Sequence, residues 1–188
     1  MRPGFADPVL DAQASFRAIL EAMSRPGRIQ RLEAAPTPPA PLAPATAAAL
    51  LTLVDAETPL FTDVGGEAAD WIRFHCGCPI VPQPGQAAFA LIVGAPPSLS
   101  ALPAGSDEDP QAGATLIWQV AALRGEAGWR LSGPGIEREH RLEVRDAPAS
   151  FIGEWAEMGR AFPRGVDAIL CAGRDLAALP RTLRIREG

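Results

Sequence analysis

The sequence predicts an α/β fold in which helices flank a mixed sheet, and three observations support this prediction. Residues 87–93, AAFALIV, form a continuous apolar run, which is typical of a central strand buried on both faces. His140, Leu142 and Val144 alternate with charged residues, as in a strand with one face in solvent. Residues 46–54, TAAALLTLV, are apolar on every side, which suits a fully buried helix. Together these patterns predict both parallel and antiparallel strands.

The first helix is expected within residues 11–27, DAQASFRAILEAMSRPG. Its apolar residues recur at the spacing i, i+3, i+4 and i+7, which predicts one buried stripe made of Phe16, Ile19, Leu20 and Met23. Asp11 is expected to cap the N-terminus with its carboxylate, and Pro26 and Gly27 are expected to end the helix.

The segment after this helix contains the strongest loop signal of the chain. Residues 28–32 are expected to form a short strand or a turn, and residues 36–44, PTPPAPLAP, a proline-rich surface loop. Beyond the buried helix, residues 60–64 predict a strand that ends at two glycines. Residues 67–75 have helical character and offer apolar side chains for packing.

The second half of the chain predicts more strands than helices. Residues 115–123 and 129–132 flank two glycines and are expected to form a hairpin with a long loop. A last helix is expected with Pro148 in its first turn and with an apolar stripe made of Phe151, Ile152, Trp155 and Met158. Residues 166–172 predict a buried strand, and residues 182–186 an edge strand.

Composition limits the possible classes of function. A length of 188 residues fits one domain, 1–188. The net charge of −5 argues against general attraction to nucleic acid or to an anionic membrane. No apolar run is long enough to span a bilayer, and no signal-peptide pattern is present. Three cysteines do not make a disulfide framework, so we expect a cytoplasmic protein.

Two residue types are missing altogether. All 17 basic residues are arginine, so neither a Schiff-base lysine nor the lysine of a phosphate-binding P-loop is available. A free-standing pyridoxal-phosphate (PLP) enzyme is therefore excluded. There is also no tyrosine, so no phenol can donate a proton.

Seven strings with consistent spacing run from residue 11 to 182. The first, FRAILEAMSRPG, contains Arg17, Ser24 and Arg25, which amphipathicity does not require. The others are LLTLVDAETP, RFHCGCP, AGATLIWQV, LSGPGI, FPRGVDAIL and ALPRT. As an ordered set they resemble the phosphonate metabolism protein H family, whose members belong to the carbon–phosphorus lyase core complex.

This resemblance implies a fold similar to the large domain of PLP-dependent transferases, without the cofactor. It implies a homodimer that joins the G, I and J subunits. With the G, I and L proteins, such a subunit is needed to form α-D-ribose 1-methylphosphonate 5-triphosphate from ATP and a phosphonate, with release of adenine. ATP is then a substrate of the assembled complex, and the chain is not active alone. The alternative is a structural scaffold without catalytic residues.

The implied reaction brings a phosphonate beside a triphosphate, which favours arginine as the binding residue. The candidates inside matched strings are Arg17, Arg25, Arg73 and Arg181. The first two bracket a helix C-terminus, where an arginine can instead cap free carbonyls. Arg181 is expected on the last strand, on the same face as Leu183 and Ile185. The other face of that strand is charged and can guard a sheet edge or dock a partner subunit.

Two further residues are candidates for catalysis. His75 can deliver a proton to the leaving adenine, although a histidine at a helix end is more often simply hydrogen-bonded. Asp55 can orient a ribose hydroxyl, or it can cap the turn before Pro59. No metal site is expected, because the CGC string of Cys76 and Cys78 lacks a second pair of ligands. The GPG string at residues 133–135 is expected to form a turn.

Overall fold

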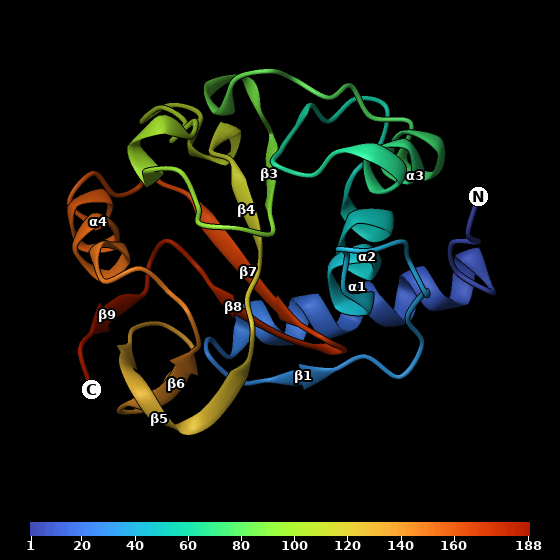
Figure 1. Cartoon of the computed structure of the whole chain (residues 1–188). Coiled ribbons are helices and arrows are strands. Elements are labelled where there is room, and N and C mark those ends of the chain that lie inside the picture. The colour runs from blue at the N-terminus through green and yellow to red at the C-terminus, as the bar shows by residue number, and fades with distance from the viewer.

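A six-stranded sheet divides the molecule into two layers in the computed structural model, which describes residues 1–188 (Figure 1). The strand order is β1-β8-β7-β4-β3-β2. Its bounds are β1 (Gln30–Arg31), β2 (Leu60–Thr62), β3 (Phe89–Ile92), β4 (Thr115–Gln119), β7 (Asp167–Ala172) and β8 (Asp175–Leu179). The four strands β2, β3, β4 and β7 are parallel, and β8 and β1 are antiparallel. The prediction of a mixed α/β fold is confirmed.

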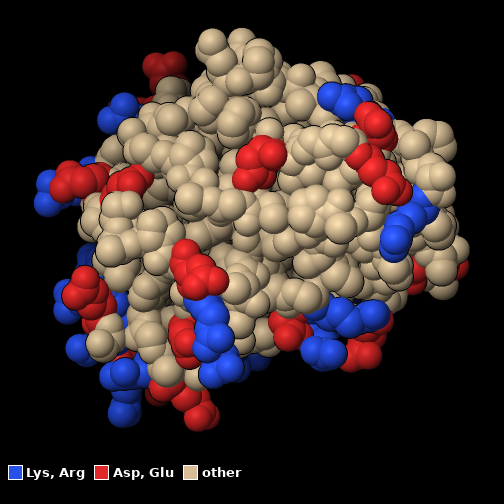
Figure 2. All heavy atoms as spheres, viewed as in Figure 1, with Lys and Arg blue, Asp and Glu red and all other residues tan.

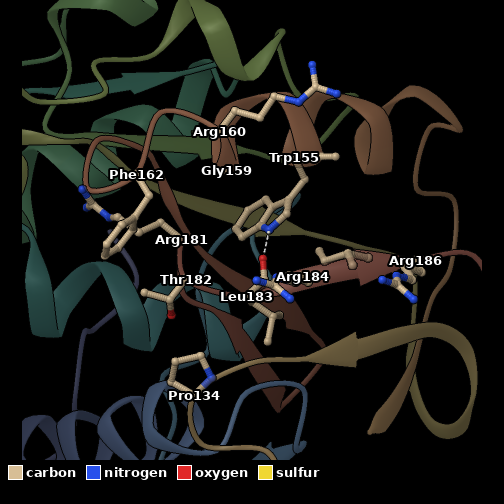
Figure 3. Close-up of a pocket in the computed structure, with 12 residues that line it drawn as sticks. Pro134, Trp155, Gly159, Arg160, Phe162, Arg181, Thr182, Leu183, Arg184 and Arg186 are labelled. Atoms are coloured by element: carbon tan, nitrogen blue, oxygen red, sulfur yellow. Dashed lines mark hydrogen bonds between the residues drawn. The ribbon is translucent and has the colours of Figure 1, made fainter.

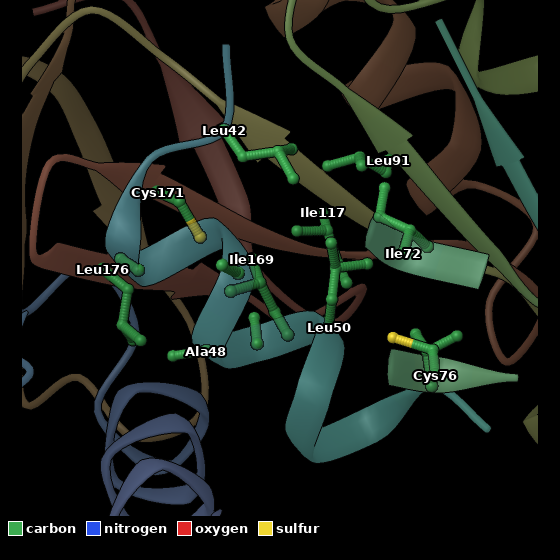
Figure 4. Packing of buried hydrophobic residues seen from close by; sticks show 14 of the residues in the cluster. Leu42, Ala48, Leu50, Ile72, Cys76, Leu91, Ile117, Ile169, Cys171 and Leu176 are labelled. Carbon is green, nitrogen blue, oxygen red and sulfur yellow. The ribbon is translucent and has the colours of Figure 1, made fainter. Parts of the chain in front are cut away.

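Three helices cover one face of this sheet: α1 (Pro8–Ser24), α2 (Pro44–Leu53) and α3 (Gly66–Cys76). Figure 4 shows Leu50 of α2 packed over Ile117 and Ile169 of the central strands. Residues 45–50 of α2 are all buried, as the apolar composition of this segment predicts.

The opposite face carries α4 (Ser150–Gly159) and a three-stranded antiparallel sheet. The small sheet has the order β6-β5-β9, with bounds β5 (Leu123–Ser132), β6 (His140–Val144) and β9 (Arg184–Arg186). Three short 3₁₀ helices lie in connections, at Pro84–Gln86, Leu99–Ala101 and Pro110–Ala112. Along β7 the side chains alternate between the two layers, since Ile169 packs with the first and Leu170 with the second.

The start of α1 differs from the prediction. Asp7, not Asp11, is the N-cap, and its carboxylate accepts hydrogen bonds from the amides of Val9 and Leu10 at 3.1 and 2.9 Å. The Asp11 carboxylate in turn accepts from the amide of Asp7 at 3.0 Å. This reciprocal arrangement resembles a capping box and begins the helix one turn earlier, with Pro8 in its first turn.

The buried face of α1 was predicted correctly only in part, since Ile19 is buried as expected but Phe16 and Leu20 are not. Phe16 and Leu20 are 49% and 57% exposed, and the buried residues are Ser15, Ile19 and Ala22. The helix packs against α2 and β8 through these smaller side chains, which allow the backbones to approach closely. The larger apolar residues are left facing solvent, although Met23 at the end of the predicted stripe is partly buried.

The predicted hairpin is wrong as well. β4 belongs to the main sheet, and the hairpin is formed by β5 and β6. The two glycines lie inside β5, where the pairing register shifts between Gly125 and Trp129. Gly128 has a φ of +76°, and a β-carbon there would lie 2.6 Å from the Cα of Glu143. The glycines therefore form an irregularity within one strand and not the turn between two strands.

The remaining elements largely follow the sequence. The predicted strands near residues 60–64, 87–93 and 166–172 are confirmed, and β9 is an edge strand as expected. β8 was not predicted; it follows β7 through a tight turn at Gly173, whose φ is +59°. Residues 36–43 have no regular structure, but several of them are buried, namely Pro36, Pro38, Pro39 and Leu42. No helix is both long enough and apolar enough to cross a bilayer.

Candidate functional site

The predicted binding residues on α1 lie on the surface. Arg25 forms an ion pair with Glu21 at 3.1 Å, and both side chains are exposed. Arg17 is exposed and has no carboxylate within ion-pair distance. The two arginines therefore do not meet at a common pocket, and their binding roles stay predictions.

Near the end of α3 the structure places His75 in a local contact. Its Nε2 lies 3.1 Å from the carbonyl oxygen of Arg2, and its ring packs against Trp71 with centroids 4.7 Å apart. Arg73 on the same helix is exposed and pairs with Asp70 at 3.0 Å. These contacts attach the N-terminal segment to α3 and leave Arg73 open to solvent.

Asp55 follows α2 and caps the turn before Pro59, which was the predicted alternative to orienting a ribose hydroxyl. Its carboxylate accepts a hydrogen bond from the amide of Glu57 at 2.9 Å and lies 3.2 Å from the Thr58 hydroxyl. The side chain is exposed, so these local bonds leave it accessible to a partner.

The three cysteines are free and buried. Burial raises the pKa of the Cys76 thiol from 9.0 to about 12, and burial also raises the pKa of Cys78. A raised pKa disfavours the thiolate, which is the form that binds a metal ion. No group of three or more His, Cys, Asp or Glu side chains is arranged to hold one.

Arg181 lies in the turn before β9 and not on the last strand as predicted, and it is the most constrained of the predicted residues. Its guanidinium donates to the Asp167 carboxylate at 2.6 and 3.1 Å and to the carbonyl of Pro110 at 2.6 Å. The Asp167 carboxylate also accepts from the backbone amide of Arg181 at 2.7 Å. The ion pair is largely buried, with side-chain exposures of 14% and 19%. Arg181 thus joins the start of β7 to a 3₁₀ connection, with two of its five N–H groups unused.

Two glycine-containing turns from distant parts of the chain meet beside the small sheet. A β-carbon on Gly135 would overlap the carbonyl oxygen of Ser24 and lie 2.8 Å from the Cδ of Pro26. Gly27 has a φ of +79°, and a β-carbon there would lie 3.0 Å from the His140 ring. The turn after α1 and the GPG turn after β5 therefore form one structural unit. Pro26 and Gly135 of this unit line one hollow, and Pro134 lines a second.

The first hollow, which we call the polar hollow, has a volume of about 310 Å³. Its charged lining residues are Arg28, Arg138, Glu137 and Glu139, and His140 lines it as well. Arg28 and Arg138 are exposed and have no carboxylate within ion-pair distance. The Glu139 carboxylate is already bound by Arg130, and this hydrogen-bonded pair lowers the pKa of Glu139. The hollow thus offers two free guanidinium groups, opposed by one free carboxylate, Glu137.

The second hollow, which we call the α4–β9 groove, has a volume of about 690 Å³ (Figure 3). Its lining includes four arginines and no acidic residue; the arginines are Arg160, Arg181, Arg184 and Arg186. The Trp155 indole crosses from α4 and donates to the carbonyl of Leu183 at 2.9 Å. The guanidinium groups do not converge on one point in the close-up, so the groove is less suited than the polar hollow to a single small anion.

The small sheet carries mixed charges around these hollows. Figure 2 shows basic and acidic side chains interspersed over the lower left of the molecule, the region that the small sheet occupies in Figure 1. Sequence reasoning did not select Arg28, Arg138 or His140 as site residues. The sequence did offer one indication of these residues, because two of the matched strings, containing SRPG and GPG, lie close to them in the chain.

The comparisons with known proteins are consistent across almost the whole chain. Residues 3–186 match the family model described as "Bacterial phosphonate metabolism protein (PhnH)". The chain is 36% identical over 186 residues to the alpha-D-ribose 1-methylphosphonate 5-triphosphate synthase subunit PhnH of Rhizobium meliloti, covering 96% of this chain and 93% of that protein. It is 33% identical over 174 residues to HtxG of Stutzerimonas stutzeri, named as a putative C-P lyase subunit protein, covering 92% and 85%.

Proposed function

The chain belongs to the bacterial phosphonate metabolism protein PhnH family, and we propose that it is a non-hydrolytic subunit of α-D-ribose 1-methylphosphonate 5-triphosphate synthase. In this proposal it acts with the G, I and L proteins to join ATP to a phosphonate and release adenine. The observation that carries the proposal is the 36% identity to a subunit of that name over 96% of the chain.

We assign the binding of the phosphonate, or of a phosphate group of ATP, to the polar hollow. A phosphonate dianion needs concentrated positive charge, and the planar guanidinium group matches its oxygens in a bidentate manner. Arg28 and Arg138 are free for this role because neither is bound to a carboxylate. The carboxylate of Glu137 repels negative charge, so it limits how much negative charge a bound ligand can carry. It also favours a ligand that offers a hydrogen-bond donor, such as a ribose hydroxyl.

We also propose that the fold corresponds to the large domain of PLP-dependent transferases without the cofactor. The chain has no lysine, so it cannot form the Schiff base that holds PLP in those enzymes. Its own contribution to the synthase reaction is then binding and orientation through arginine.

The alternative function is a scaffold, and the exposed side of α1 favours it. Val9, Phe16 and Leu20 lie on one line of the helix and are 74%, 49% and 57% exposed. Two copies of α1 could pack antiparallel, related by a two-fold axis that passes between Gln13 and Phe16. Val9 of one copy would then lie against Leu20 of the partner subunit. The line is therefore self-complementary, which supports a homodimer, while contacts with the G, I and J subunits would use other surfaces.

Reconstitution with the G, I and L proteins distinguishes the two functions. The measurement is adenine release from ATP and methylphosphonate, together with the mass of the complex by light scattering. The variant is Arg28→Ala/Arg138→Ala, and the matched control is Arg124→Ala, which removes an exposed, unpaired arginine near the other end of β5. Loss of adenine release in an intact complex supports the binding role. Full release by the double variant would refute the assigned site and favour the scaffold.

A further inference from the structure

The outer edge of β9 is free to pair with another strand. β9 pairs with β5 along one edge, and no strand pairs with the other edge, which faces α4. On that side the carbonyl of Leu183 accepts the Trp155 indole N–H at 2.9 Å. Backbone polar groups alternate in direction along a strand, so the N–H and C=O of Ile185 point toward the outer edge, as the carbonyl of Leu183 does. An edge of this kind is a template for an added strand.

The α4–β9 groove has room for such a strand. Its volume of about 690 Å³ lies within the range of pockets that hold ligands. Opposite β9, the wall formed by α4 presents Ala156 and Gly159, and Trp155 is the one bulky side chain of α4 that crosses the groove, at Leu183. At one end of the groove Phe162 is 60% exposed, which offers an apolar contact to an incoming side chain (Figure 3).

The positive charge of the groove indicates what kind of ligand it binds. Arg184 and Arg186 project to the solvent side of β9, while Leu183 and Ile185 are buried beneath it. Neither of these two arginines has a carboxylate within ion-pair distance, and the groove lining contains no acidic residue. Arg160 and Arg181 are paired with Glu157 and Asp167, so the free positive charge of the groove comes from Arg184 and Arg186, in a chain whose net charge is −5.

From these observations we infer that the α4–β9 groove binds an extended acidic segment of a partner protein as a strand added to β9. Directly opposed residues of paired strands lie on the same face of the sheet. Acidic side chains at positions i and i+2 of the segment therefore face Arg184 and Arg186, and the residue between them points into the groove. The preferred segment alternates acidic and apolar residues. This inference does not depend on the synthase role or on the polar hollow.

The experiment titrates the full chain with a capped nonapeptide of alternating glutamate and valine, followed by calorimetry. We expect binding that weakens with added salt, because charged contacts are screened. Arg184→Glu/Arg186→Glu should weaken binding at least tenfold, and the matched control Arg124→Glu should leave it within twofold. The same double variant should bind a peptide of alternating lysine and valine instead, which a misfolded protein would not do.

Three results would overturn the inference. One is the absence of binding by the glutamate peptide at millimolar concentration. Another is equal binding of tripolyphosphate, or equal binding of both of two peptides that are N-methylated along one edge and along the other, since a small polyanion site needs no backbone pairing. The third is self-association of the chain that Arg184→Glu/Arg186→Glu abolishes, which would assign the groove to a second copy of this protein.

Discussion

Gly135 approaches Ser24 so closely that a β-carbon on the glycine would overlap the serine carbonyl oxygen. The contact fixes the turn after α1 against the turn after β5, and Gly135 has a φ of +83°, which L-residues with side chains rarely adopt. Pro26 and Gly135 line the polar hollow and Pro134 lines the α4–β9 groove, so the contact adjoins both.

Replacing Gly135 should therefore be costly. We expect Gly135→Ala to lower the free energy of unfolding by about 1–3 kcal/mol, since it combines a strained φ with a steric overlap against backbone. Gly153→Ala is the matched control, because a β-carbon there meets nothing within 4 Å and the residue lies within α4. Alanine should stabilise that helix position by about 0.5–1 kcal/mol. Urea denaturation measures both, and equal effects of the same sign would contradict this account.

The Asp167–Arg181 ion pair should contribute more to stability than the surface pairs. Asp167→Asn removes the charge that compensates a largely buried guanidinium group, and we expect a loss of about 2–3 kcal/mol in the free energy of unfolding. The matched control is Asp175→Asn, whose partner Arg31 is 63% exposed, and there the loss should stay below about 1 kcal/mol. Thermal and urea unfolding of both variants provide the test. A smaller effect at Asp167 than at Asp175 would contradict the role given to Arg181.

Alkaline pH should destabilise the protein through its buried thiols. Burial raises the pKa of Cys76 and Cys171 from 9.0 to about 12, so above pH 9 the unfolded chain loses these protons while the folded chain keeps them. The folded-state pKa is the higher one, so the stabilisation is complete below pH 9 and is lost as the pH rises toward 12. The chain has no lysine or tyrosine, so only the thiols, Cys78 included, are expected to titrate strongly in this window.

The measurement is the free energy of unfolding in urea at pH 8 and pH 10.5, under reducing conditions, for the wild type and for Cys171→Ala. Stability should fall between the two pH values, and the fall should be smaller in the variant because one buried thiol is gone. An identical fall in both proteins would show that Cys171 is not responsible. The absolute stability of the variant is not the readout, since removing the sulfur also leaves a cavity.

Local sequence patterns correctly predicted the elements that are apolar on every side, because such segments must be buried wherever they pack. The run of alanine and leucine in α2 is apolar all round, and the apolar run of β3 fits a strand covered on both faces. The buried side of α1 could not be found in this way, because an apolar stripe has the same spacing whether it faces the sheet or another protein. The polar hollow was missed because Arg28 and Arg138 come from distant parts of the chain and are brought together by tertiary contacts, such as that between Gly135 and Ser24.

The exposed line on α1 gives the final prediction. If two copies pair through it, Phe16→Glu/Leu20→Glu should convert the homodimer to a monomer, because two carboxylates per chain would be buried against apolar side chains. The melting temperature of the monomer itself should change little, since both side chains face solvent in the isolated chain. Phe74→Glu is the matched control, an equally drastic change at a residue of α3 that is 69% exposed. Light scattering across a concentration series measures the mass, and a Phe16→Glu/Leu20→Glu protein that stays dimeric would place the interface elsewhere.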